Sequence, residues 1–271
     1  RRDTFPAIAL VSAYLHDVKG VDENEAVAVC PVDPYVEDSY FSAVHQLTQL
    51  VGTGAGELML MGVEPTYASE KYGYILPQNK ETVSHVLSFR EKPDADAAQR
   101  YIDEGALWNS GVFAYCLGYV LTRARQLLGC SDYEGLLVAY ESLEKISFDY
   151  AVVEHENNIG VLRYGGAWKD LGTWNTLTEI MEETTLGNAV LDDGCRNTHV
   201  VNEMDVPVLV MGAQNLVIAA SPEGILVADK AASSYMKPYV ERISQPVMFA
   251  EKSWGSFRII DVEDESLTIK V

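Results

Sequence analysis

Apolar residues near the start of the chain recur with the spacing of one helix face. They predict a helix over residues 3–18, because side chains three or four positions apart lie on the same side of a helix. Asp3 or Thr4 can cap this helix, and Pro6 suits its first turn. The positions that form the apolar stripe are Ile8, Val11, Leu15 and Val18.

Short apolar runs then alternate with helical patterns as far as residue 185. The unbroken apolar run that opens residues 26–36 and leads into a proline-rich turn is typical of a parallel strand covered on both faces. The runs at 72–77 and 83–93 are close enough in the chain to form neighbouring strands. Helical patterns separate the remaining runs, which predicts an α/β fold with a doubly wound, mostly parallel sheet. These patterns cover residues 37–51, 94–105, 117–145 and 167–183.

The pattern changes after residue 185. Short β runs separated by turn residues predict a small β-helix-like region over residues 186–245, closed by a helix at 229–243. The last residues, 246–271, have the pattern of new β structure. We therefore expect an α/β domain at 1–185, the β-helix-like region, and the start of a further domain at the end of the sequence.

The composition excludes several classes of partner. There are 20 basic and 40 acidic residues, a net charge of −20, whereas bulk nucleic-acid binding needs basic surfaces. No apolar run approaches the roughly 18 residues of a membrane span, and residues 1–10 lack the apolar core of a secretory signal. The four cysteines lie far apart with no CxxC pair, which favours a reduced, cytoplasmic protein.

Two aspartates follow apolar strands and are candidate metal ligands. Asp33 ends the first predicted strand, and Asp170 lies in a glycine-flanked turn before a helix. Ligands collect at the carboxyl ends of strands in open α/β sheets, and Mg²⁺ prefers oxygen ligands. The structural alternatives are that Asp33 begins an Asp-Pro turn and that Asp170 caps the helix.

Glu91 and Lys92 end a predicted strand directly before Pro93. The carboxylate of Glu91 can accept hydrogen bonds from two sugar hydroxyls, and Lys92 can pair with a phosphate. We expect Pro93 to hold Lys92 in an extended conformation. A solvated strand end is the structural alternative.

Further polar candidates lie in short motifs. Asn109 offers a donor and an acceptor, Gly73 lies between two tyrosines, and Asp149 precedes an apolar turn. No GxSxG, HExxH, GxxxxGK[ST] or GxGxxG motif occurs. The glycine-rich residues 52–56 follow a helix and precede a strand, the wrong order for a dinucleotide fingerprint, so we interpret them as a flexible turn.

Several motifs together resemble a known family. They occur in the order found in sugar-phosphate nucleotidyltransferases, most similar to the mannose-1-phosphate guanylyltransferases (GDP-mannose pyrophosphorylases), over roughly residues 1–228. Residues 246–271 are similar to the opening of the cupin isomerase domain of two-domain relatives. The motifs that carry the first resemblance are RRDTFPAIAL, PVDPYV, GVEPTYASEKYGYI, FREKPDADAAQRYIDEGALWNSGVF, SFDYAVVE and AWKDLGTWNTL.

The resemblance implies a nucleotide-diphospho-sugar transferase fold and a reaction. GTP and mannose 1-phosphate would give GDP-mannose and pyrophosphate by in-line attack of the sugar phosphate, assisted by Mg²⁺. It also implies site residues. Asp33 and Asp170 would bind Mg²⁺ and, with Lys92, form the catalytic set. The substrates would contact Arg2, Thr4, Pro6, Ala7, Gly73, Tyr74, Glu91, Asn109 and Asp149.

This sequence departs from the family in one feature, the glycine-rich loop that binds the triphosphate. The family begins with a strand and a glycine-rich loop that wraps the triphosphate, and this chain opens after that point. We therefore expect it to be an interior piece of a longer protein, and whether these residues are active by themselves stays open. The alternatives are a non-catalytic, nucleotide-sugar-binding regulatory relative and a nucleotidyltransferase for another sugar 1-phosphate. A related glycosyltransferase ranks below them, and the resemblance implies a homodimer.

Overall fold

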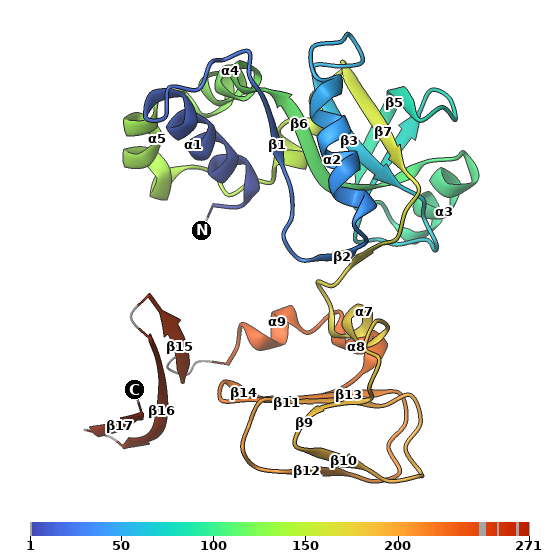
Figure 1. Cartoon of the computed structure of the whole chain (residues 1–271), viewed down its shortest axis with the longest axis vertical. Coiled ribbons are helices and arrows are strands. Elements are labelled where there is room, and N and C mark those ends of the chain that lie inside the picture. Colours follow the sequence, from blue (N-terminus) through green and yellow to red (C-terminus); the bar gives the residue numbers. More distant parts are fainter. Residues whose placement is uncertain (1, 244–247, 254, 264–265, 271) are drawn as a thin grey trace. The chain divides into compact units, whose positions relative to one another are not determined.

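The computed structural model describes residues 2–243, 248–253, 255–263 and 266–270 (Figure 1). The chain forms two compact units, Arg1–Trp168 and Lys169–Val271. The three-part division expected from the sequence stays a prediction. Among the described residues, no helix combines the length and the apolar character needed to cross a membrane.

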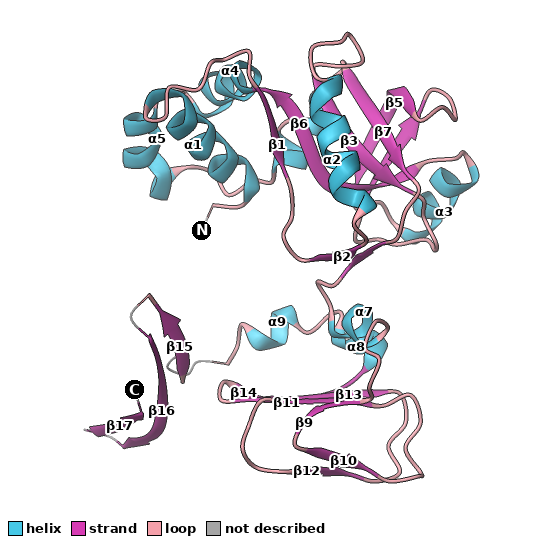
Figure 2. Ribbon diagram, in the orientation of Figure 1, coloured by secondary structure: helices cyan, strands magenta, loops and turns pink. Residues whose placement is uncertain are grey.

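The first unit is built on a six-stranded sheet (Figure 2). Its strand order is β1-β6-β3-β7-β5-β4, and β4 also pairs with the start of β6. The strands are β1 (Ala26–Val29), β3 (Leu58–Val63), β4 (Gly73–Pro77), β5 (Val83–Glu91), β6 (Leu107–Cys116) and β7 (Ile159–Tyr164). The short strand β2 (Pro34–Val36) follows β1 in the chain.

The sheet confirms the α/β class but is mixed in direction. Strands β3 and β7 form a parallel ladder, whereas β6 lies between β1 and β3 and runs antiparallel to both. The predicted neighbours β4 and β5 pair with each other, in antiparallel orientation. Strand β1 was expected to be parallel and covered on both faces. That expectation is wrong: among the described strands β1 pairs with β6 alone, and its residues are partly exposed. A short apolar run does not reveal its position in the sheet.

Helices cover both faces of this sheet. Alternate residues of β3 point to opposite faces, so that Leu58 and Leu60 join one apolar cluster while Met59 and Met61 join another. Figure 2 shows α2 crossing the strands on one side, where it contacts β3, β6 and β7. The helices are α1 (Thr4–Asp17), α2 (Ser39–Leu50), α3 (Ala95–Asp103), α4 (Leu117–Leu128), α5 (Tyr133–Ala139) and α6 (Phe148–Ala151), with 3-10 turns η1 (Tyr140–Ser142) and η2 (Val153–His155).

Residues near the helix ends satisfy the free backbone groups there, and the predicted cap at Asp3 is confirmed. The carboxylate of Asp3 accepts a hydrogen bond from the amide of Thr4 at the start of α1. Asp94 accepts one from Ala97 at the start of α3, and Gly105, with φ of +88°, follows the end of that helix. Glycine adopts this left-handed conformation without steric cost, which explains why the helix ends there.

The second unit contains the expected β-helix-like region. Parallel ladders join β9 to β11 and β11 to β13 on one side, and β10 to β12 on the other. Val200, Val210 and Ile218 are buried between them. These strands are β9 (Thr185–Gly187), β10 (Ala189–Leu191), β11 (His199–Asn202), β12 (Val208–Val210) and β13 (Leu216–Ser221), and β14 (Gly224–Asp229) pairs antiparallel with β13.

The closing helix is shorter than predicted. It divides into α8 (Lys230–Ser233) and α9 (Lys237–Val240), and Pro238 lies in the first turn of α9. Because proline has no amide hydrogen, it begins a helix more readily than it continues one. The remaining elements of this unit and of its boundary are β8 (Trp168–Asp170), α7 (Trp174–Thr178), and an antiparallel sheet of β15 (Phe249–Lys252), β16 (Gly255–Glu263) and β17 (Ser266–Lys270).

Candidate active site

Glu91 and Gly73 lie opposite each other where β5 and β4 pair. The side chain of Glu91 is 7% exposed. A Cβ atom added to Gly73 would lie 2.6 Å from Oε2 of Glu91 and 2.7 Å from the ring of Phe89. No other residue type fits here without displacing the carboxylate, so the glycine places bare backbone beside a buried acid.

Lys92 directs its ammonium back onto this acid. Its Nζ atom lies 2.6 Å from Oε1 of Glu91 and 5.9 Å from the ring centroid of Tyr150. Burial lowers the pKa of Lys92, but the hydrogen bond to Glu91 and the nearby negative charges outweigh it, so that pKa lies above its usual value. The lysine therefore stays charged, and half of its side chain is exposed to a ligand.

The backbone of Lys92 differs from the expectation. Its φ is +47°, which is left-handed and not extended, so the prediction from Pro93 is wrong. Few non-glycine residues adopt such an angle, which costs on the order of 1 kcal/mol and persists only where neighbouring contacts enforce it. The long-range contacts of this turn, which the local sequence does not contain, decide its conformation.

Asn109 and Asp149 form the second half of the cluster. The Nδ2 atom of Asn109 donates to Oδ1 of Asp149 over 2.8 Å, and its Oδ1 atom accepts from the amide of Gly111 over 3.1 Å. Asn109 is buried, with 8% of its surface exposed. Both bonds fix the orientation of the amide group, which leaves its second amide hydrogen and the second oxygen of Asp149 for a ligand.

The environment of Asp149 favours its protonated form. Burial raises the pKa of Asp149 to about 6, and the carboxylate of Glu91 acts in the same direction. The backbone amide of Asp149, the charge of Lys92 and the hydrogen bond from Asn109 lower this pKa without cancelling the rise. The interaction between Asp149, Glu91 and Lys92 indicates that the two halves of the cluster form one electrostatic site.

A single segment, residues 147–155, connects these groups. The amide of Phe148 donates to Oγ1 of Thr4 over 2.8 Å, and Asp149 binds Asn109. Tyr150 packs near Lys92, and Oε1 of Glu154 accepts from the backbone amide of Glu91 over 3.0 Å. Sequence analysis assigned no role to Tyr150 or Glu154, since nothing in their spacing indicates which distant strand they contact.

The other predicted site residues are not part of this cluster. Tyr74 is 1% exposed, and its hydroxyl donates to the carbonyl and accepts from the amide of Ser69. Its side chain therefore serves the core, and its contribution to a ligand is limited to its backbone. Arg2 precedes α1, and Pro6 and Ala7 lie in the first turns of that helix, with Pro6 buried.

The two predicted metal ligands belong to different units. Asp33 is exposed in the turn between β1 and β2. Asp170 accepts a 2.7 Å hydrogen bond from the amide of Gly172 with Oδ1. The alternative that Asp170 caps the helix is wrong, because the side chain of Thr173 caps α7. No group of three or more His, Cys, Asp or Glu within the described part of the chain could hold a metal. Mg²⁺ often takes only one or two carboxylates and completes its shell with water and phosphate.

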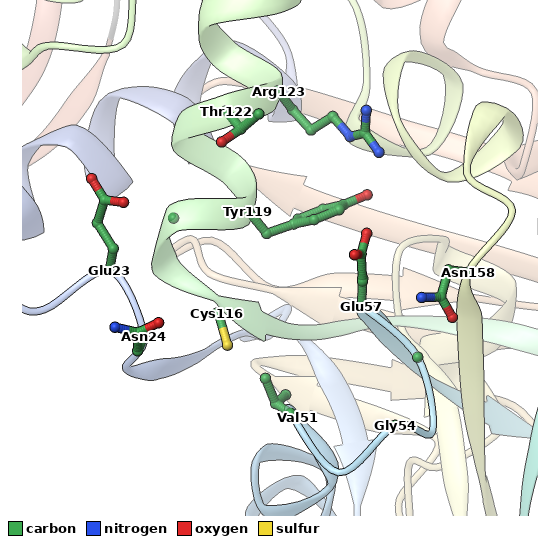
Figure 3. Close-up of a pocket in the computed structure, with 13 residues that line it drawn as sticks. Glu23, Asn24, Val51, Gly54, Glu57, Cys116, Tyr119, Thr122, Arg123 and Asn158 are labelled. Carbon is green, nitrogen blue, oxygen red and sulfur yellow. The ribbon is translucent and has the colours of Figure 1, made fainter.

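A cavity of about 600 Å³ lies at the opposite end of the sheet, where β6 ends and β3 and β7 begin (Figure 3). Tyr119 of α4 points across it toward the carboxylate of Glu57, and Arg123 lies further along the same helix. Arg123 pairs with Glu156, and its guanidinium lies 5.1 Å from the ring centroid of Tyr119. Because the carboxylates of Glu57 and Glu23 line the same cavity and would repel phosphate groups, the site does not suit a triphosphate.

The glycine-rich residues 52–56 form one wall of this cavity. Gly52 and Gly54 have φ values of +77° and +91° and connect α2 to β3. The prediction of a helix-to-strand turn is therefore confirmed.

Comparison with known proteins adds to this geometry. Residues 1–186 match the family described as Nucleotidyl transferase. The chain belongs to this nucleotidyltransferase family. The match covers most of the chain and includes both the Glu91–Lys92 turn and the Asn109–Asp149 pair. The residues of the cluster thus lie inside the matched domain.

The curated relatives include a mannose-1-phosphate guanylyltransferase of Salmonella muenchen, 27% identical over 100% of this chain. A protein of the same name from Escherichia coli is 27% identical over 97% of the chain. The chain spans 63% and 62% of their lengths, about three fifths of each relative.

A solved structure from Thermus thermophilus has a similar fold. It is described as a mannose-1-phosphate geranyltransferase and superposes with a TM-score of 0.73 at 30% identity, covering 89% of this chain and 75% of that one. A mannose-6-phosphate isomerase structure from Helicobacter pylori, with a TM-score of 0.52 and 24% identity, shares the fold over 63% of this chain and 72% of its own.

Proposed function

We propose that the complete protein is a mannose-1-phosphate guanylyltransferase. It would convert GTP and mannose 1-phosphate into GDP-mannose and pyrophosphate. The observation that carries the proposal is the buried Glu91 carboxylate beside Gly73, paired with Lys92 and adjacent to the Asn109–Asp149 pair. The similarity to relatives named for this activity supports it.

The chemistry of the cluster suits a sugar phosphate. Oε2 of Glu91, the backbone at Gly73 and the free positions of Asn109 and Asp149 offer several acceptors and a donor for sugar hydroxyls. The exposed ammonium of Lys92 offers a charge for the phosphate. Since the sugar phosphate is itself the nucleophile, the protein needs to hold its oxygen in line with the α-phosphorus and to balance charge, without a covalent intermediate.

We propose Asp33 and Asp170 as ligands of Mg²⁺, on the basis of the resemblance and of their oxygen chemistry. When bound, the metal neutralises phosphate charge. Arg2, Thr4, Pro6 and Ala7 are proposed to contact the base and ribose. A homodimer and a cytoplasmic location complete the proposal, and the four free cysteines agree with a reducing compartment.

Turnover by the complete protein tests the proposal. We expect pyrophosphate release from GTP and mannose 1-phosphate in the presence of Mg²⁺, with far lower rates for ATP with glucose 1-phosphate and for dTTP with glucose 1-phosphate. Calorimetric titration with GDP-mannose, with ADP-glucose and dTDP-glucose as controls, gives an independent measure. GDP-mannose binding without turnover would favour a non-catalytic regulatory relative, and preference for another pair would reassign the substrates.

A further inference from the structure

The amide of Glu91 is bound by a side chain and not by a neighbouring strand. Strand β7 pairs with Val83, Ser84 and His85 at the beginning of β5, while the end of β5 pairs with β4. The Glu91 amide donates to the carboxylate of Glu154, which comes from η2 and lies 63 positions later in the chain. A carboxylate thus takes the place of a strand at this point of the sheet.

The next amide is held from a different segment. Lys92 donates its backbone N–H to the carbonyl oxygen of Tyr72 over 3.2 Å. Two consecutive amides are therefore bound by groups from separate parts of the chain. Between them, the backbone of Lys92 adopts its left-handed φ of +47°. Such a conformation persists where the surroundings fix it from several sides. Here the Glu91 amide donates to Glu154 and the Lys92 amide donates to Tyr72, and these two bonds fix the turn.

The position of the Lys92 ammonium depends on this turn. Its Nζ atom lies 2.6 Å from Oε1 of Glu91, so a change in the turn moves the charge away from both Glu91 and Tyr150. Tyr150 and Glu154 lie on the same short segment, which therefore contacts the side chain of Lys92 and the backbone that carries it.

We infer that Glu154 is a positioning residue, which holds the Glu91–Lys92 turn in the geometry that binds the sugar phosphate. The inference rests on the proposed function, and it assigns to Glu154 no contact with the substrate. A carboxylate that accepts from a backbone N–H forms a stronger bond than a neutral acceptor, but a neutral carbonyl oxygen in the same place can still accept. Acceptor geometry, more than negative charge, is what the turn requires.

Two substitutions in the complete protein separate these properties. Glu154→Gln keeps a side-chain oxygen that can accept from the Glu91 amide, whereas Glu154→Ala removes the acceptor. We expect Glu154→Ala to raise the KM for mannose 1-phosphate about tenfold, as for loss of one charge-assisted hydrogen bond. The KM for GTP should change by less than about twofold, because the turn is proposed to hold only the sugar phosphate. Compared with the wild type, Glu154→Gln should retain most of the affinity for mannose 1-phosphate.

Glu144 provides a matched control. It is an exposed glutamate that precedes Glu154 in the same stretch of chain, and Glu144→Gln and Glu144→Ala should both leave the two KM values unchanged. If Glu154→Ala raised both KM values equally, or changed neither, the positioning role would be wrong. If Glu154→Gln were as impaired as Glu154→Ala, the charge of Glu154 would matter and the acceptor role would be overturned.

Amide hydrogen exchange tests the same contact without substrates. Glu154→Ala should accelerate exchange of the Glu91 amide at least about tenfold, while Glu154→Gln should leave it protected. Unchanged exchange in the alanine variant would overturn the inference whatever the kinetics show. If the wild-type protein turned over neither substrate, the proposed function would fail, and the exchange measurement would still decide whether Glu154 holds the turn.

Discussion

The side-chain amide of Asn109 donates to the carboxylate of Asp149 over 2.8 Å, which links the start of β6 to helix α6. Asp149 is also near Glu91, and burial raises its pKa to about 6. Burial thus destabilises the charged form of this carboxylate. Carboxylates with pKa values shifted in this way are more frequent at binding sites than elsewhere on a protein.

This environment predicts a pH-dependent stability. The pKa of Asp149 is about 6 in the folded protein and 3.8 in the unfolded chain, so the folded state binds the proton more tightly. The contribution of this proton to stability is fully present below pH 3.8 and is lost as the pH rises through about 6. Asp149→Asn stays neutral and keeps an oxygen for Asn109. Relative to the wild type, the variant should gain on the order of 2 kcal/mol in unfolding free energy between about pH 4 and pH 7. Denaturant unfolding at both pH values measures this, and an equal difference at both would contradict the assignment.

Gly73→Ala should disturb the sugar site directly. The added methyl group would lie 2.6 Å from Oε2 of Glu91, so the carboxylate must move. We expect the KM for mannose 1-phosphate to rise about tenfold, the size of a lost polar contact. Gly165→Ala is the control, since a Cβ there meets no atom within 4 Å. Steady-state kinetics in which both variants behave like the wild type would show that Gly73 is not near the bound sugar.

Asp170→Asn separates the metal role of this residue from its structural role. The amide oxygen of asparagine can still accept from Gly172, so the turn should be retained. The loss of negative charge should weaken Mg²⁺ binding and reduce turnover by about a hundredfold or more. Circular dichroism melting should match the wild type. Normal turnover with Mg²⁺ would remove Asp170 from the metal site.

Local signals explain why part of the fold could be predicted from the sequence. The cap at Asp3 and the end of the helical pattern at residue 105 depend on residues within a few positions of one another. The position of β1 could not be predicted in this way, because it depends on β6 entering the sheet between β1 and β3, far along the chain.

In the candidate site, too, local patterns reveal some residues, whereas the roles of others depend on contacts between distant segments. Glu91, Lys92 and Asn109 could be found because they are polar residues at the ends of apolar strands, and their family motifs are specific in combination. The backbone angle of Lys92 and the role of Glu154 could not, because each depends on a contact between distant segments. Tyr74 is next to Gly73 in the chain, but the hydrogen bonds of its hydroxyl with Ser69 direct its side chain into the core, and the sequence does not reveal this contact.

The most direct test of the account is the effect of Glu91→Ala on the two Michaelis constants of the complete protein. If Glu91 binds the sugar hydroxyls and holds Lys92, the KM for mannose 1-phosphate should rise by about tenfold or more, while the KM for GTP stays within about twofold. An equal rise in both constants, or none in either, would contradict the assignment of this cluster to the sugar phosphate.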